Sequence, residues 1–169
     1  MKAYDQNTGD LVVNAAFPAN GIPGEVISVR TDLGVQVHAW RPNPLPQNLL
    51  QCYFCHGYSL GTYAQFGYSI MSGQSLHQVL ADEFFKVGTL GMGNLHVQQG
   101  DRIVWWKGLD AIHSAVVDHP VQNGNQLNVN QTRVSSKTGT GIVRINVPLA
   151  TVNNDYNTAN LREIYRRQP

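Results

Sequence analysis

Four short β-rich segments separated by turns occupy the second half of the chain, and they limit the folds that it can adopt. The connections between them contain the tetrapeptides KGLD, QNGN and KTGT, which carry the Gly, Asn and Asp residues that tight turns favour. The segments are rich in Val, Ile and Trp, which are common in strands. They cover residues 101–106, 111–118, 126–132 and 141–147. Short turns between consecutive strands predict an antiparallel sheet.

The first 48 residues have a different composition, rich in Pro, Gly and Asn. Alternating runs at residues 25–31 and 34–40 predict a pair of strands. The segment RPNPLPQN after them predicts an extended connection, because each Pro removes a backbone donor. We therefore expect an N-terminal β- and Pro-rich extension over residues 1–48 and a main domain over residues 49–169, together forming one compact unit.

Helices are expected before and after the sheet. Apolar spacing over residues 49–67 favours a first helix that begins near the two cysteines. A second helix is better marked, because Ser75 can cap its start with Gln78 three residues later and Gly88 can end it. The tail NTANLREIYRRQP has basic residues near its end and favours a last short helix.

Charge and hydropathy exclude several classes of partner. Charged residues make up 14% of the chain and the net charge is +1, so no nucleic-acid partner is predicted. No apolar run approaches the ~18 residues that a membrane span requires, so no membrane partner is predicted either. Polar residues rather than an apolar signal segment follow Met1 and Lys2. We expect a soluble protein that is cytoplasmic or delivered by a dedicated secretion route, with its oligomeric state left open.

The segment CYFCH, from Cys52 to His56, matches the C-x-x-C-H pattern that attaches a c-type haem. A haem iron would need a second axial ligand, for which Met71 and Met92 are candidates. The β-rich second half differs from a small helical cytochrome, and the other histidines form no second paired cluster for zinc. We therefore expect neither a cofactor nor a metal.

Nucleophilic catalysis is a different use of the same segment. A cysteine in the first turn of a helix lies in the positive end of the helix dipole, which favours the thiolate. Cys55 is preferred to Cys52 because Gly57 leaves room for a substrate. A cysteine nucleophile also needs a general base. His113 fits this role, because it lies in the strand-like run AIHSAVVD and can project toward the helix start.

The order of these elements resembles a known family. A helix opened by a cysteine is followed by the strand GD-x-hydrophobic-V-W (residues 100–105) and then by HSAVV (residues 113–117). This order is similar to that of papain-like cysteine hydrolases of the NlpC and CHAP type, and it extends over about residues 49–147. Members of that group cleave peptide or amide bonds, commonly in bacterial cell-wall peptides, and related folds occur in secreted toxins and deamidases. The resemblance implies a papain-like α+β fold, in which N-terminal helices, with the nucleophile at a helix start, pack on an antiparallel β-sheet.

The resemblance also implies further members of the site. A polar residue on the strand after the histidine strand would hold the imidazole in its productive tautomer. The candidates for this third residue are Asn128, Asn130 and Ser136. The oxyanion would be bound by the backbone N–H of Cys55 and the side chain of Gln51. Tyr58 and Trp106 are candidates for lining the substrate groove.

We therefore expect a cysteine-dependent hydrolase that cleaves a peptide or amide bond through a Cys–His thiolate, as a cell-wall hydrolase or a toxin-type effector. A deamidase or an acyltransferase would use the same residues, so the substrate is left open. The main alternative is a non-enzymatic β-rich interaction module in which Cys55 and His113 are structural. Haem binding through CYFCH is the third.

Overall fold

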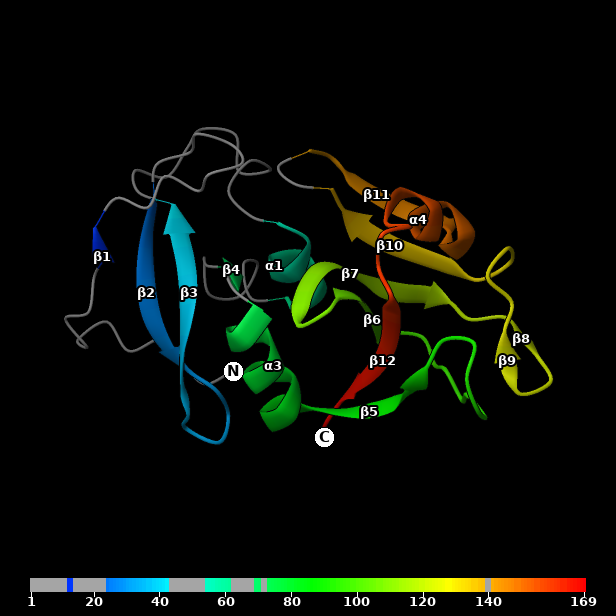
Figure 1. Ribbon diagram of the computed structural model, residues 1–169, viewed down its shortest axis with the longest axis horizontal. Helices are drawn as coiled ribbons and strands as arrows, with labels where there is room; N and C mark the ends of the chain where they lie inside the picture. Colours follow the sequence, from blue (N-terminus) through cyan, green and yellow to red (C-terminus); the bar gives the residue numbers. More distant parts are fainter. Residues whose placement is uncertain (1–11, 14–23, 43–53, 62–68, 71–72, 139–140) are drawn as a thin grey trace. The chain divides into compact units, whose positions relative to one another are not determined.

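The computed structural model describes residues 12–13, 24–42, 54–61, 69–70, 73–138 and 141–169 (Figure 1). The chain forms two compact units. The first comprises residues 1–83 and 137–142, and the second comprises residues 84–136 and 143–169. The domain boundary expected after residue 48 falls in the segment 43–53, which lies outside the described residues.

The fold is mostly β, with 47% of it in strands and 18% in helices. The described residues contain three helices: α1 (Cys55–Ser59), α3 (Gly73–Glu83) and α4 (Leu149–Asp155). The papain-like α+β fold, with N-terminal helices packed on a sheet, is therefore wrong as a prediction. Within the described part of residues 49–67, α1 has only five residues. Its end is set by Gly61, which has a φ of 71° and so adopts the left-handed conformation that ends helices.

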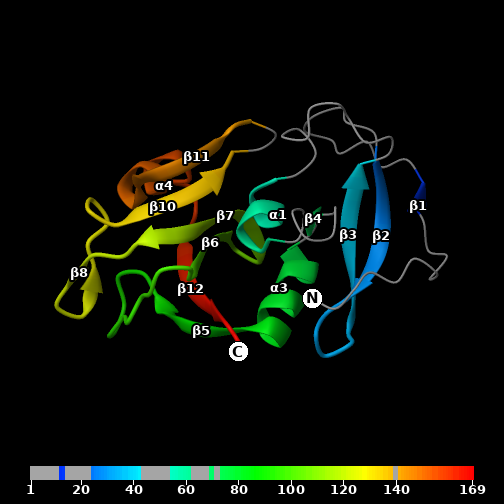
Figure 2. The same cartoon turned by 180° about the vertical axis from the view of Figure 1, so that it is seen from behind.

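A six-stranded antiparallel sheet forms most of the second unit. Figure 2 shows it from behind, with β12 running between β5 and β6. In spatial order the strands are β11 (Val143–Pro148), β10 (Arg133–Lys137), β7 (Asp110–His119), β6 (Arg102–Lys107), β12 (Leu161–Arg167) and β5 (Phe84–Thr89). The antiparallel sheet predicted from the turns is thus confirmed, but the strand predicted at residues 126–132 is wrong. Only Gln126–Leu127 is extended there, as β9 in a short hairpin with β8 (Gln122–Asn123), and β10 takes the place of the predicted strand in the sheet.

Two segments expected to be helical are strands. The tail forms β12, which pairs with both β5 and β6, and residues 84–89 form β5 instead of continuing the helix before them. Strand β12 has a partner on each side, and β5 at the edge of the sheet pairs with β12. This pairing satisfies backbone polar groups, and the gain overrides a weak local preference for helix. The expected stop at Gly88 therefore lies inside a strand.

Helix α4 supplies apolar side chains to the core of the second unit. Leu149 and Val152 of α4 are fully buried, together with Ile103 of β6 and Ile164 of β12, which are cross-strand partners. Burying a side chain of this size contributes about 1.5–3 kcal/mol, so these contacts hold the helix on the sheet.

An ion pair joins β6 to β12 at the GD segment. Arg166 donates from Nε to Oδ1 of Asp101 at 2.8 Å and from Nη2 to Oδ2 at 2.9 Å. The Oδ2 atom of Asp101 also accepts the backbone N–H of Gln98 at 2.8 Å. The hydrogen bond with Asp101 raises the pKa of Arg166 above its ordinary value. Gly100 before it has a φ of 87°, which accounts for glycine at this turn.

The first unit contains a four-stranded sheet in the order β1 (Val12–Val13), β2 (Gly24–Arg30), β3 (Gln36–Pro42) and β4 (Ser69–Ile70). The predicted strand pair at residues 25–31 and 34–40 is confirmed as the β2–β3 hairpin. Thr31, at its turn, donates from Oγ1 to Asp82 of α3, so the hairpin and the helix are linked. Ser75 does not cap α3, because the helix begins at Gly73; its Oγ instead accepts the backbone N–H of His38 at 3.1 Å.

Candidate functional site

His113 lies on β7 in a cluster of aromatic side chains of the second unit. Trp105 on β6 is its cross-strand partner, so both side chains are on the same face of the sheet. The imidazole stacks on the ring of Tyr156 with 3.9 Å between centroids and 9° between planes. The indole of Trp105 is tilted by 54° with its centroid 5.3 Å away. Only 1% of His113 is exposed, so the ring is enclosed.

The aromatic rings around His113 are themselves fixed by α4. Asn153 accepts the indole Nε1–H of Trp105 on Oδ1 at 3.0 Å. Tyr156 is the C-cap residue of α4, and its backbone N–H donates to the carbonyl of Val152 at 3.1 Å. Docking of α4 therefore determines where both rings lie.

The Nε2 atom of His113 is buried and has no hydrogen-bond partner among the described residues. The Oγ atom of Ser136 is in the same condition. Ser136 is opposite Ala115 of β7, two residues from His113, and so lies on the same face as a diagonal neighbour. Because buried polar groups are nearly always paired, these two atoms need an explanation.

The asparagines expected to hold the imidazole are occupied elsewhere. Asn128 donates from Nδ2 to Gln131 at 3.1 Å, and its Oδ1 accepts the backbone N–H groups of Asn130 at 3.1 Å and of Gln131 at 3.2 Å. This is the local bonding of a turn. Asn130 is exposed in that turn. Within the part of the chain that is described, no hydrogen bond joins either asparagine to His113.

Cys55 is the first residue of α1 in the first unit, and it is half-buried. Phe54 precedes it as the N-cap residue and makes no side-chain cap hydrogen bond. A helix of five residues has few aligned peptide dipoles, so the dipole expected to favour a thiolate is weak here. Gln51, the expected oxyanion donor, and Cys52 lie outside the described residues.

The two residues expected in a substrate groove differ in exposure. Tyr58 on α1 is half-buried. Trp106 on β6 is 1% exposed, so its indole is buried rather than presented to solvent.

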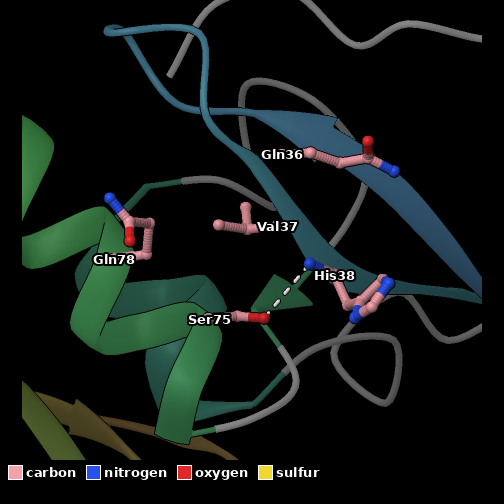
Figure 3. A pocket seen from close by; sticks show the side chains of 5 residues that line it. All are labelled: Gln36, Val37, His38, Ser75 and Gln78. Atoms are coloured by element: carbon pink, nitrogen blue, oxygen red, sulfur yellow. Dashed lines mark hydrogen bonds between the residues drawn. The ribbon is translucent and has the colours of Figure 1, made fainter.

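A small pocket lies in the first unit between β3 and α3. Figure 3 shows Val37 and His38 on the strand facing Ser75 and Gln78 on the helix, with Gln36 further along the strand. The volume of the pocket is about 160 Å³. Its polar lining is made of amide, hydroxyl and imidazole groups, which suits a neutral polar group.

The haem and metal alternatives can be compared with the described residues. Met92, a candidate axial ligand, is 65% exposed, whereas Met71 lies outside the described part. In residues 73–138, 141–169 and the shorter described segments, no group of three or more His, Cys, Asp and Glu side chains could hold a metal ion. The helices described are all too short or too polar to cross a membrane.

Sequence reasoning identified His113 but missed Tyr156 and Asn153. Asn153 is in α4 and Tyr156 is its C-cap residue, in a segment for which no helix was expected. The stacking depends on how α4 docks on the sheet, and no local pattern in the sequence indicates it.

Comparisons with protein-family models, with curated proteins and with solved structures found no match to this chain.

Proposed function

We propose that the protein is a cysteine-dependent hydrolase of peptide or amide bonds, with Cys55 as the nucleophile and His113 as the general base. The observation that carries this proposal is the unpaired Nε2 atom of His113 in a ring that stacks on Tyr156 and is bordered by Trp105. A structural histidine normally pairs its buried nitrogens, whereas a general base must keep one nitrogen for the proton that it removes.

The reaction proceeds through an acyl-enzyme. His113 takes the proton from Sγ of Cys55, and the sulfur attacks the carbonyl carbon of the substrate. The tetrahedral intermediate collapses with cleavage of the C–N bond, and His113 returns the proton to the leaving amine. Water, deprotonated by the same imidazole, then attacks the thioester and releases the acid and the thiol. Because the helix dipole at α1 is weak, formation of the thiolate depends mainly on His113.

Alkylation of Cys55 by iodoacetamide tests this pairing. An unpaired thiol with a pKa of about 8.5 is only about 0.3% thiolate at pH 6, so labelling at that pH reports a paired thiolate. In a Cys52→Ser background we expect rapid labelling of Cys55 at pH 6 and a fall of at least about tenfold in His113→Phe. Phe keeps an aromatic ring next to Tyr156 and has no nitrogen to accept the proton.

His119→Ala is the matched control, because His119 is on the same strand and is exposed. In His119→Ala, Cys55 should be labelled at the same rate as in the parent protein. Equal rates in the parent and in His113→Phe would contradict the proposal. A positive result justifies a screen of fluorogenic peptides, including bacterial cell-wall peptides, with amine acceptors added to separate hydrolysis from acyl transfer.

The second candidate function is a non-enzymatic β-rich interaction module. The burial of His113, at 1% exposed, favours it, because a histidine enclosed to this degree can serve packing alone. In that case His113→Phe would change the free energy of unfolding and leave the labelling rate of Cys55 unchanged. His113→Phe, with His119→Ala as its control, therefore distinguishes the two functions.

A further inference from the structure

We propose that Tyr156 is the positioning residue of His113, and that its ring takes the place of a polar third residue in the site. The inference rests on the proposed function, since it concerns how the general base is oriented. It differs from the expected arrangement, in which an amide or hydroxyl side chain would hold the imidazole.

The orientation of a histidine ring needs an external restraint. The rotation about the Cβ–Cγ bond joins an sp³ to an sp² carbon and has a broad energy minimum, so the side chain alone does not fix the plane of the ring. Tyr156 supplies the restraint, because a separation of 3.9 Å and an angle of 9° place the two rings in nearly parallel contact. Turning the imidazole out of this plane would break the stack.

Tyr156 is well placed for this role because its own position is fixed. Its backbone N–H bonds to Val152 at 3.1 Å, and its carbonyl accepts the N–H of Ala159 at 3.1 Å. On the sheet, Trp105 borders the imidazole and is held by Asn153. Asn153 of α4 and the C-cap residue Tyr156 therefore determine the space in which His113 lies.

The polar candidates do not provide this restraint. The side chain of Asn128 is bonded within its own turn. The Oγ atom of Ser136 makes no hydrogen bond to any described residue, His113 included. The aromatic rings of Trp105 and Tyr156 do contact the imidazole.

Three substitutions separate stacking from bulk. Tyr156→Phe keeps the aromatic face, whereas Tyr156→Leu keeps an apolar side chain without one. A single ring contact biases the orientation by about twofold to tenfold. In the Cys52→Ser background we therefore expect Cys55 labelling at pH 6 within about twofold of the parent for Tyr156→Phe, and slower by up to about tenfold for Tyr156→Leu. Asn154→Ala, which removes an exposed side chain from the same helix, should leave the labelling rate unchanged.

Nuclear magnetic resonance measures the ring position independently of Cys55. The ring protons of His113, assigned by their absence in His113→Phe, should be displaced upfield by the ring current of Tyr156. These resonances should keep their positions in Tyr156→Phe and move downfield in Tyr156→Leu, where the indole of Trp105 is the aromatic ring that still borders the imidazole. Unchanged resonances in Tyr156→Leu would overturn the inference, as would labelling at the parent rate in that variant when His113→Phe slows labelling.

These readouts also separate failure of this inference from failure of the proposed function. If His113→Phe leaves labelling unchanged, the hydrolase proposal fails, and the ring-proton shifts still decide whether Tyr156 orients the imidazole. If Tyr156→Leu does not fold, Tyr156→Met fills the same space with a flexible side chain and takes its place in both experiments. His113 ring-proton resonances at the same positions in Tyr156→Met as in the parent would then overturn the inference, and their movement downfield would support it.

Discussion

Asp101 provides a direct test of how β6 is joined to β12. Its two oxygens accept three hydrogen bonds, two from the fork of Arg166 and one from the backbone of Gln98. In Asp101→Asn one oxygen is replaced by an amide nitrogen of nearly the same size. In either orientation of the amide, its N–H₂ group faces at least one N–H donor, so the variant loses both the charge and part of the bonding.

The size of the expected loss in unfolding free energy depends on how exposed Asp101 and Arg166 are. Removing one member of a buried ion pair costs about 3–5 kcal/mol. The side chain of Asp101 is 2% exposed, but that of Arg166 is 26% exposed and can turn partly toward water. Asn also keeps one accepting oxygen. We therefore expect Asp101→Asn to lower the free energy of unfolding by about 2–3 kcal/mol.

Urea denaturation followed by circular dichroism and by tryptophan fluorescence measures this change. The matched control is Asp155→Asn, because Asp155 pairs with Arg144 at 2.7 Å and is 43% exposed. The same chemical change there should alter the free energy of unfolding by no more than about 0.5 kcal/mol. Equal effects of the two substitutions would refute the reasoning, because burial would then not determine the cost.

Two further predictions concern packing and pH. A Cβ atom at Gly88 would lie 2.5 Å from Cδ2 of the buried Leu95, so Gly88→Ala should destabilise the protein by about 1–3 kcal/mol, and Leu95→Val should recover part of the loss in urea denaturation. Burial, and then the hydrogen bond to Glu163, raises the pKa of Tyr165. The neutral phenol is thus favoured in the folded state, so the contribution of Tyr165 to the free energy of unfolding is complete below about pH 10 and is lost as the pH rises further. The urea midpoint should therefore fall less steeply above about pH 10 in Tyr165→Phe than in the parent.

Local signals predicted the hairpins, and non-local pairing decided the rest of the fold. Gly34 and Gly108 have φ values of 88° and 62°, and they close the turns between β2 and β3 and between β6 and β7. Such turns are encoded by the residues that form them. The tail gave no comparable signal, because its strand β12 is defined by its partners β5 and β6. A strand preference that comes from neighbours far along the sequence is not visible in a local pattern.

In the candidate site too, some residues could be predicted from local sequence and others could not. His113 could be predicted from its place in a β-rich run, and the structure places it on β7 as expected. Tyr156 could not, since the stack requires α4 to dock on the sheet before the two rings meet. Asn128 was a reasonable candidate by residue type, but the same amide group that could bind an imidazole also closes its own turn.

The GD segment (residues 100–101) is weaker support for a hydrolase in the structure than it is in the sequence. The hydrolase prediction rests partly on a resemblance to papain-like hydrolases that includes this segment. Three features carried that resemblance: a cysteine at a helix start, the GD strand and the histidine strand. The structure gives the GD strand a complete structural reason, because Gly100 makes the turn and Asp101 binds Arg166 and Gln98. Any sheet that needs this anchor could contain the same dipeptide, so it no longer supports catalysis. What distinguishes a hydrolase from a packed β-domain is therefore the chemistry of Cys55 and the unpaired Nε2 atom of His113, which the labelling experiment addresses.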